Sequence, residues 1–302
     1  MTVASDDKAL QATLNGVDIP PCPAVLLELE AELAKPNTDQ RELARLITRD
    51  VALSGHVMQV ANSPAFSTGQ PLTSIIHALN VLGTRQVFSL LVAQLLKAAV
   101  SGKQEASMER FWETSAQTAR LAAEIARRLR CVRPDIAYTF GLFRDCGIPI
   151  LMANYLDYID ILRAANSESL RAFTEIEDEE MGVDHASIGA TLAREWRLPI
   201  EYQAAIEFHH DSDAVRGASA HVMPDVARYF IALAQLAEYL FQRQTGLNKT
   251  QEWGKLGQAC LDLLLLQPSD VDALQDTLAA NEVLHSLCSQ ASAGPDAWPA
   301  HR

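Results

Sequence analysis

Apolar residues in this chain recur every three or four positions, and this spacing continues through most of the sequence. In residues 23–35, for example, Val25, Leu26, Leu29 and Leu33 fall on one helical face and glutamates lie opposite. The strict alternation of a half-buried strand is not found, and no internal repeat is evident. Glycine and proline number only 14 and 13 in 302 residues, so few positions interrupt regular structure. The pattern predicts an all-α protein.

Residues with known capping preferences mark where the helices should begin and end. Thr38 or Asp39 can cap a helix, because short oxygen-bearing side chains accept hydrogen bonds from the free amides of a first turn. Gly83 stands where one helix is expected to end, and Thr84 begins a strongly apolar one. The apolar stretch 87–100 is too short to span a bilayer and contains polar residues. We therefore expect a buried helix and no membrane insertion.

The predicted helices fall into two groups that are separated by a polar stretch. We expect a tail at 1–14, a helical bundle at 15–100, a junction at 101–110, a second helical subdomain at 111–285 and another tail at 286–302. Within the second subdomain, residues 212–225 are expected to form a loop because they are rich in small and polar side chains. The two subdomains should pack against each other.

Charge and cysteine usage exclude several classes of protein. A net charge of −13 argues against a nucleic-acid binder, because such proteins use a basic surface to displace counterions from phosphates. The five cysteines are scattered without a CxxC pair, which is typical of reduced thiols rather than of a disulfide framework or a zinc knuckle. The N-terminal sequence MTVASDDK lacks the apolar core of a signal peptide. We expect a cytoplasmic location.

The stretch AIEFHHDSD, residues 205–213, offers three potential metal ligands in a row: His209, His210 and Asp211. On a helix, neighbouring side chains diverge by about 100°, so the two imidazoles would not easily bind one ion. They would serve two ions, or one would bind while the other packs; a solvent-facing histidine pair at a helix end is the alternative. No glycine-rich phosphate loop, GxSxG or HExxH motif accompanies them. A metal site would need further ligands from elsewhere in the chain.

Other polar and aromatic residues have structural interpretations. The acidic run Glu175–Glu180 is expected to be a solvated helix face or, alternatively, a docking patch for a basic partner. Asn62 and Ser63 are expected to end a helix, or to contribute to a contact surface between the halves. Trp112 and Trp196 are expected to pack inside the second half.

Several motifs, taken in order, resemble the HDOD (HD-related output domain) family. In the first half they are Asp50, Leu53, Asn62 and Ser63, followed by a helix that carries Ile75, Ala78, Leu82 and Gly83. In the second half they are FWETSAQTA, FGLFRDCGIPIL and GVDHASIGATLAREWRLPIEYQAAIEFHH, and the likeness covers about residues 17–245. The resemblance implies two packed helical subdomains, the second HD-like, and an output role in bacterial signal transduction.

Enzymes of the wider HD superfamily are metal-dependent phosphohydrolases, and the resemblance implies that this chain keeps only part of their ligand set. Thr114 stands at the position of the first histidine, Arg144 replaces the histidine of the His-Asp doublet, and Gln235 replaces the late aspartate. The retained candidates are Asp145, His185, His209 and His210. They could hold one divalent ion or line a small polar pocket. No GYP-type sequence follows, so the cyclic-dinucleotide phosphodiesterase branch is not matched.

Arg144 argues against a catalytic metal site, because a guanidinium cannot lose its proton and repels a metal ion. Arg144 is expected to pair with Asp145 or another acidic neighbour, or to bind an anion. We expect a non-catalytic regulatory module that binds a protein partner, with its site in the groove between the halves. The alternatives are a phosphohydrolase that uses the retained ligands, and a regulator that binds a nucleotide or small anion without hydrolysis. The pocket candidates are Arg144, Asp145, His185, His209, His210 and Gln235, and no cofactor is expected beyond a residual divalent metal.

Overall fold

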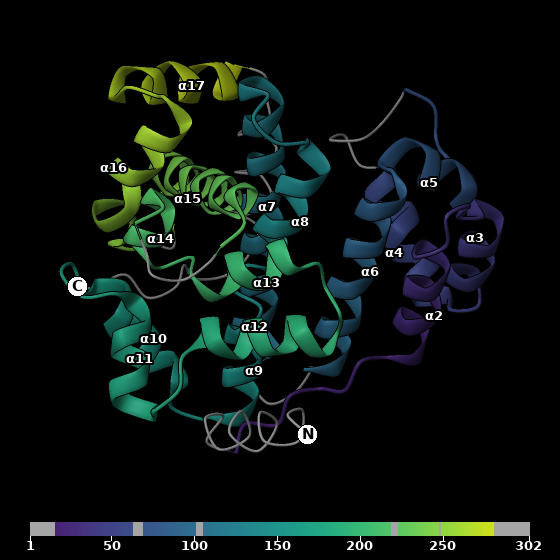
Figure 1. The fold of residues 1–302 in the computed structure, drawn as a ribbon, viewed down its shortest axis with the longest axis horizontal. Helices are drawn as coiled ribbons and strands as arrows, with labels where there is room; N and C mark the ends of the chain where they lie inside the picture. Colours follow the sequence, from purple (N-terminus) through teal and green to yellow (C-terminus); the bar gives the residue numbers. More distant parts are fainter. Residues whose placement is uncertain (1–15, 63–68, 101–104, 219–222, 248, 281–302) are drawn as a thin grey trace.

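The computed structural model describes residues 16–62, 69–100, 105–218, 223–247 and 249–280. All regular elements within these ranges are helices, and no strand occurs among the described residues. The helices form two groups that lie side by side (Figure 1). The prediction of an all-α protein with two helical subdomains is confirmed; the tails predicted at 1–14 and 286–302, and Ser63, lie outside the described residues.

The first group is a small bundle of five helices at one side of the molecule. It consists of α2 (Ala24–Leu33), α3 (Gln40–Thr48), α4 (Val51–Ala61), α5 (Ile75–Leu82) and α6 (Thr84–Ala99). The carboxylate of Asp39 accepts a hydrogen bond from the amide of Arg41 at the start of α3, so of the two predicted caps, Thr38 and Asp39, it is Asp39 that caps this helix. Gly83 ends α5 with a φ of +85°, a backbone conformation that favours glycine. The helix boundaries of this bundle therefore follow local sequence signals.

The second group contains the remaining helices. They are α7 (Glu105–Leu129), α8 (Pro134–Phe143), α9 (Gly147–Asn154), α10 (Tyr158–Ser167), α11 (Phe173–Met181), α12 (His185–Glu195), α13 (Ile200–Glu207), α14 (Ser212–Arg216), α15 (Asp225–Thr245), α16 (Glu252–Leu264) and α17 (Pro268–Ala280). The predicted junction at 101–110 already contains the start of α7, because Met108 and Trp112 fall on one buried helical face. The predicted loop at 212–225 begins with α14, whose first amides are capped by the carboxylate of Asp211.

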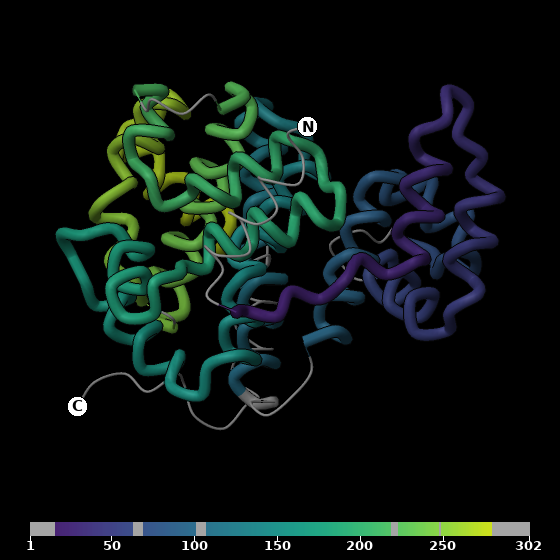
Figure 2. The backbone as a smooth tube through the Cα atoms, turned by 60° about the horizontal axis from the view of Figure 1, so that its bottom comes forward, coloured from purple at the N-terminus to yellow at the C-terminus, as the bar shows by residue number. Residues whose placement is uncertain are grey.

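Hydrogen bonds and ion pairs tie the groups together. The hydroxyls of Ser89 on α6 and Thr139 on α8 form a buried 2.9 Å hydrogen bond. The segment before α2 runs across the second group (Figure 2), and there the indole of Trp196 donates a 2.9 Å hydrogen bond to the carbonyl of Pro20. Trp196 is fully buried, as predicted. These contacts make α8 and the N-terminal segment part of the connection between the two halves, to which ion pairs also contribute.

One described stretch, Pro134–Asn154, has the length and apolar composition of a membrane-crossing helix. It comprises α8, a turn at residues 144–146, and α9. Of its apolar window, 78% is buried inside the protein, so this stretch belongs to the core of the second group and does not indicate membrane insertion.

Candidate functional site

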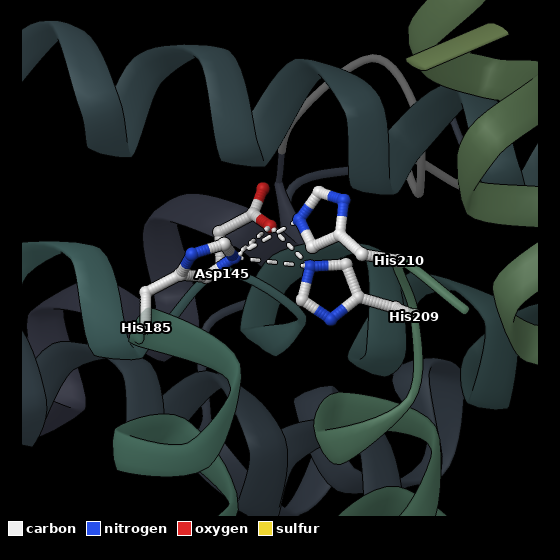
Figure 3. Close-up of side chains that lie close together, drawn as sticks. All are labelled: Asp145, His185, His209 and His210. Carbon is white, nitrogen blue, oxygen red and sulfur yellow. Dashed lines mark hydrogen bonds and ion pairs between the residues drawn. The ribbon is translucent and has the colours of Figure 1, made fainter. Parts of the chain in front are cut away.

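Four polar side chains converge at one point in the second group of helices (Figure 3). The Nε2 atom of His185 lies 3.2 Å from Nε2 of His209 and 3.2 Å from Nε2 of His210. Asp145 completes the set, with Oδ1 3.1 Å from Nε2 of His209 and 3.8 Å from Nε2 of His185. All four potential ligand atoms lie within 4.8 Å of one another. The structure thus brings together the four candidates that the sequence retained.

Helix ends and turns position all four residues. Asp145 lies in the turn between α8 and α9, and His185 is the first residue of α12, which Asp184 caps through the amide of Ser187. His209 and His210 follow the end of α13 and occupy a turn. The prediction that these neighbours diverge as residues of one helix is therefore wrong. In a turn, neighbouring side chains do not have to diverge by the roughly 100° of a helix, so both imidazoles can point to the same place.

Each imidazole has a hydrogen-bond acceptor beside its other nitrogen. The Nδ1 atoms of His185, His209 and His210 lie 2.6, 2.7 and 2.5 Å from Glu177 Oε2, the Ile206 carbonyl and Glu252 Oε2, respectively. A ring nitrogen beside an acceptor carries the proton, so in the neutral imidazole Nε2 offers a lone pair. When all three rings are neutral in this tautomer, as metal binding requires, three lone pairs face one another. Histidines that bind metal ions have this same outer contact to a carboxylate or carbonyl.

The donor set fits one divalent cation. Metal–nitrogen bonds of about 2.0–2.1 Å in a tetrahedral zinc site place the donor atoms about 3.3 Å apart. Four of the six separations between the donor atoms are 3.1, 3.2, 3.2 and 3.8 Å, close to that value, and all six are within 4.8 Å. Three imidazoles and one carboxylate suit Zn²⁺, and they also bind Fe²⁺ or Mn²⁺. Across the described ranges, no second group of this kind occurs.

Burial and neighbouring charges set the protonation states of the cluster when no metal ion is bound. Burial lowers the pKa of His185, but Glu177 and Asp145 outweigh this effect and raise it to about 9. For His210, burial dominates and lowers the pKa to about 3. Burial raises the pKa of Asp145, but the adjacent Arg144 outweighs it and holds that pKa well below its usual range. The cluster therefore contains a carboxylate, a protonated His185 and a neutral His210 near neutral pH, and a bound metal ion would replace the proton on His185.

Arg144 lies beside the four-residue cluster and is fixed by two carboxylates. Its Nε is 2.9 Å from Asp145 Oδ2 and its Nη2 is 2.8 Å from Glu238 Oε2, and the side chain is only 8% exposed. Its Nη1 atom is buried and has no hydrogen-bond partner among the described residues. The guanidinium thus pairs with Asp145 and an acidic neighbour.

A cavity of about 630 Å³ adjoins the cluster. Its walls come from α7 to α12, α15, α16 and the loop between the last two, all in the second group. They include Phe111, Thr114, Asp145, Arg163, His185, His210, Glu238, Lys249 and Glu252. The predicted location of the site, the groove between the halves, does not coincide with this cavity. The cavity lies within the second group because all its lining residues belong to α7 or to later segments of the chain.

The remaining sequence candidates lie in different surroundings. Thr114, at the position of the missing histidine, lines the cavity from α7. Gln235 on α15 is buried, at 2% exposure, but it is not among the residues that line the cavity. Glu238, one turn further along α15, lines the cavity instead and binds Arg144. Gln235 is therefore a core residue and not a pocket residue in this structure. Asp211 is engaged as a helix cap.

Sequence reasoning missed Glu177, because it lies within the acidic run that was expected to be a solvated helix face. Glu177 has no exposed surface, and it accepts hydrogen bonds from the Tyr158 hydroxyl and from the backbone amide and Nδ1 of His185. The other acidic residues of the run are exposed. The helical spacing contained a signal: Phe173 and Ile176 place Glu177 on the same buried face. Glu252, which binds His210, carried no comparable signal.

A family model described as the HDOD domain matches residues 19–212. A curated relative from Treponema pallidum, described as an uncharacterized protein, is 26% identical over 196 residues; the match covers 64% of this chain and 38% of that protein's length.

Solved structures share the fold. An HDOD domain protein of unknown function from Geobacter sulfurreducens has a TM-score of 0.66 at 24% identity, covering 94% of this chain and 98% of that one. A candidate phosphohydrolase from Shewanella amazonensis has a TM-score of 0.67 at 20% identity, covering 92% and 97%. A candidate signal transduction protein from Marinobacter aquaeolei has a TM-score of 0.66 at 20% identity, covering 96% and 66%.

Proposed function

This chain belongs to the HDOD domain family, and we propose that it is a regulatory module of signal transduction that holds one divalent metal ion and acts on a partner protein. The observation that carries the proposal is the ligand cluster of Asp145, His185, His209 and His210, which supplies donors for one ion. Arg144, beside it, keeps a permanent positive charge bound to Asp145 and Glu238, at a position where a second ion would need a ligand.

The cluster has a direct route to the first group of helices. Asp145 follows the end of α8, and Thr139 in the same helix binds Ser89 of α6. A change in how Asp145 is held can therefore alter the packing of α8 against α6, since a helix transmits such a shift as a rigid element. A divalent ion bound to the cluster supplies a fixed positive charge that orders its four ligands. The side chains of Glu177 and Glu252 hold His185 and His210 in the tautomers that this requires.

Metal analysis of the purified chain tests this proposal. After dialysis against a trace of divalent metal, we expect about one ion per chain, and His209→Ala should retain at least tenfold less because it removes a ligand. His77→Ala, an exposed histidine on α5, is the matched control and should retain as much as the wild type. Wild-type protein without metal, or equal losses in both variants, would contradict the proposal. Protein capture with wild-type and His209→Ala baits then measures whether partner binding depends on the cluster.

A second candidate function is metal-dependent phosphohydrolysis, favoured by the opening of the cluster onto the 630 Å³ cavity. A divalent ion in such a site acts as a Lewis acid toward a phosphoryl oxygen. If the regulatory proposal holds, metal-loaded wild type should hydrolyse bis(4-nitrophenyl) phosphate no faster than His209→Ala does. Turnover by the wild type that is lost in His209→Ala and kept in His77→Ala would establish the phosphohydrolase instead.

A further inference from the structure

Two arginines that line the cavity each have a buried nitrogen without a hydrogen-bond partner among the described residues. Arg144 has a buried Nη1 without a partner, although its other nitrogens bind Asp145 and Glu238. Arg163 on α10 binds Asp160 through Nη1, but its Nε is buried without a partner among the described residues. Both residues line the same cavity. A buried N–H without an acceptor costs about 1–3 kcal/mol, so two of them at one cavity indicate an absent acceptor.

The acidic residues of the cavity wall are already engaged. Asp145 and Glu238 bind Arg144, and Glu252 binds both His210 and Lys255. Lys249 adds a further cation to the wall. The unsatisfied groups among the lining residues are both donors, because the buried atoms without partners there are the two arginine nitrogens. The chemistry of the wall consequently selects an anion.

The remaining lining residues are largely apolar and favour a ligand with an apolar part. Phe111, Ile148, Met152, Leu162, Phe173 and Leu247 line the cavity between the charged side chains. Its volume of about 630 Å³ falls within the range of small-molecule sites, about 300–1,000 Å³. Arg144 lies in the turn after α8 and Arg163 lies on α10. A phosphate group has three terminal oxygens, so it can accept hydrogen bonds from two separate guanidinium groups at once, whereas a carboxylate has only two oxygens in one plane.

From these observations we propose that the cavity binds a small organic phosphate with an apolar or aromatic body, through Arg144 and Arg163. The ligand is the input signal of the module, so this assignment rests on the proposed regulatory function, although it does not depend on the metal ion. Arg144 occupies the position where the resemblance implies the metal-binding histidine of the His-Asp doublet, so the phosphate subsite is a property of this chain's own sequence.

The ligand would join elements that otherwise have few links. Arg163 belongs to α10, which a 3.1 Å backbone hydrogen bond from Gln251 to Asn166 connects to the loop before α16. Arg144 follows α8, the helix that contacts the first group through Thr139. An anion held by both arginines fixes α10 relative to α8, and so couples occupancy of the cavity to the contact between the halves.

Isothermal titration of the full chain with phenyl phosphate, phenol, benzoate and inorganic phosphate tests the proposal. We expect phenyl phosphate to bind at least tenfold more tightly than each of the other three, in metal-loaded and in chelator-treated protein alike. Phenol binding of equal strength would mean that the cavity recognises only the apolar body, and benzoate binding of equal strength would overturn the choice of phosphate. Absence of phenyl phosphate binding, or release of phenol during the titration, would each overturn the proposed signal ligand.

Substitutions separate the arginine contacts from a loss of folding. Arg163→Gln should weaken phenyl phosphate binding at least tenfold while the protein stays folded, because this side chain is 42% exposed. Arg144→Gln should do the same, with the native circular dichroism spectrum as its control. Arg49→Gln, an exposed arginine of the first group that binds Glu28, should bind phenyl phosphate like the wild type. Unchanged binding in Arg163→Gln overturns the phosphate site even if metal content is as expected, whereas missing metal with intact phenyl phosphate binding overturns only the metal proposal.

Discussion

Replacing Gly147 with alanine is expected to destabilise the protein by about 3 kcal/mol or more and to impair the ligand cluster. A methyl group built on Gly147 would overlap the carbonyl oxygen of His185 and would lie 2.9 Å from the backbone nitrogen of Gly189. Both obstacles are backbone atoms of α12, so no side chain can rotate away to make room. The helices α9 and α12 would have to separate, and His185 would move away from Asp145. Urea unfolding of the metal-free protein measures the loss.

Gly55→Ala is the matched control for Gly147→Ala. Gly55 is exposed in the middle of α4, and a methyl group there would meet nothing within 4 Å. Alanine restricts the unfolded chain and favours the helix, so this variant should be more stable than wild type by about 0.5–1 kcal/mol. Opposite signs for the two glycine substitutions would establish the close approach of α9 and α12. A Gly147→Ala protein as stable as wild type would contradict it.

Replacing Glu177 with alanine is expected to produce the second large effect, a loss of about 3–5 kcal/mol in the free energy of unfolding of the metal-free protein. The substitution leaves three buried donors without their acceptor: the Tyr158 hydroxyl, and the backbone amide and Nδ1 of His185. It also removes the acceptor that fixes the tautomer of His185. Metal affinity, measured by competition with a chelator, should therefore fall about 10–100-fold.

Glu180→Ala provides the comparison on the same helix. Glu180 is exposed on α11, and its removal should change stability by no more than about 0.5 kcal/mol and leave metal affinity unchanged. Glu177→Gln, which keeps an acceptor oxygen but not the charge, should fall between Glu177→Ala and wild type. Similar behaviour of Glu177→Ala and Glu180→Ala would show that Glu177 does not support the cluster.

The arrangement around Asp145 limits what kind of metal site this chain can form. Its carboxylate faces His209 through Oδ1 and Arg144 through Oδ2, so one side chain links the candidate ion to the guanidinium. The guanidinium of Arg144 neutralises the carboxylates of Asp145 and Glu238, a role that a second metal ion would otherwise have. For this reason we propose a single ion with a regulatory role, and we propose that the neighbouring cavity binds an anion.

The sequence by itself determined the helical class of the fold and several helix boundaries, above all those of the first group. Apolar spacing, and caps such as Asp39 and Gly83, act between residues no more than about four positions apart, so they can be recognised without knowing the fold. The candidate ligands were also found from the sequence, through the resemblance of their surrounding motifs to the HDOD family. The boundaries failed mainly where polar residues continue a helix, as at the start of α7.

Only the tertiary structure decided how those residues act together. Asp145 and His209 are separated by 64 positions, and His210 and Glu252 by 42, and no local pattern fixes the distance between such residues. The burial of Glu177, the exclusion of Gln235 from the cavity and the two carboxylate partners of Arg144 likewise depend on how whole helices pack. Local interactions determine where helices form, whereas the convergence of helix ends on one cluster is set by contacts between distant segments.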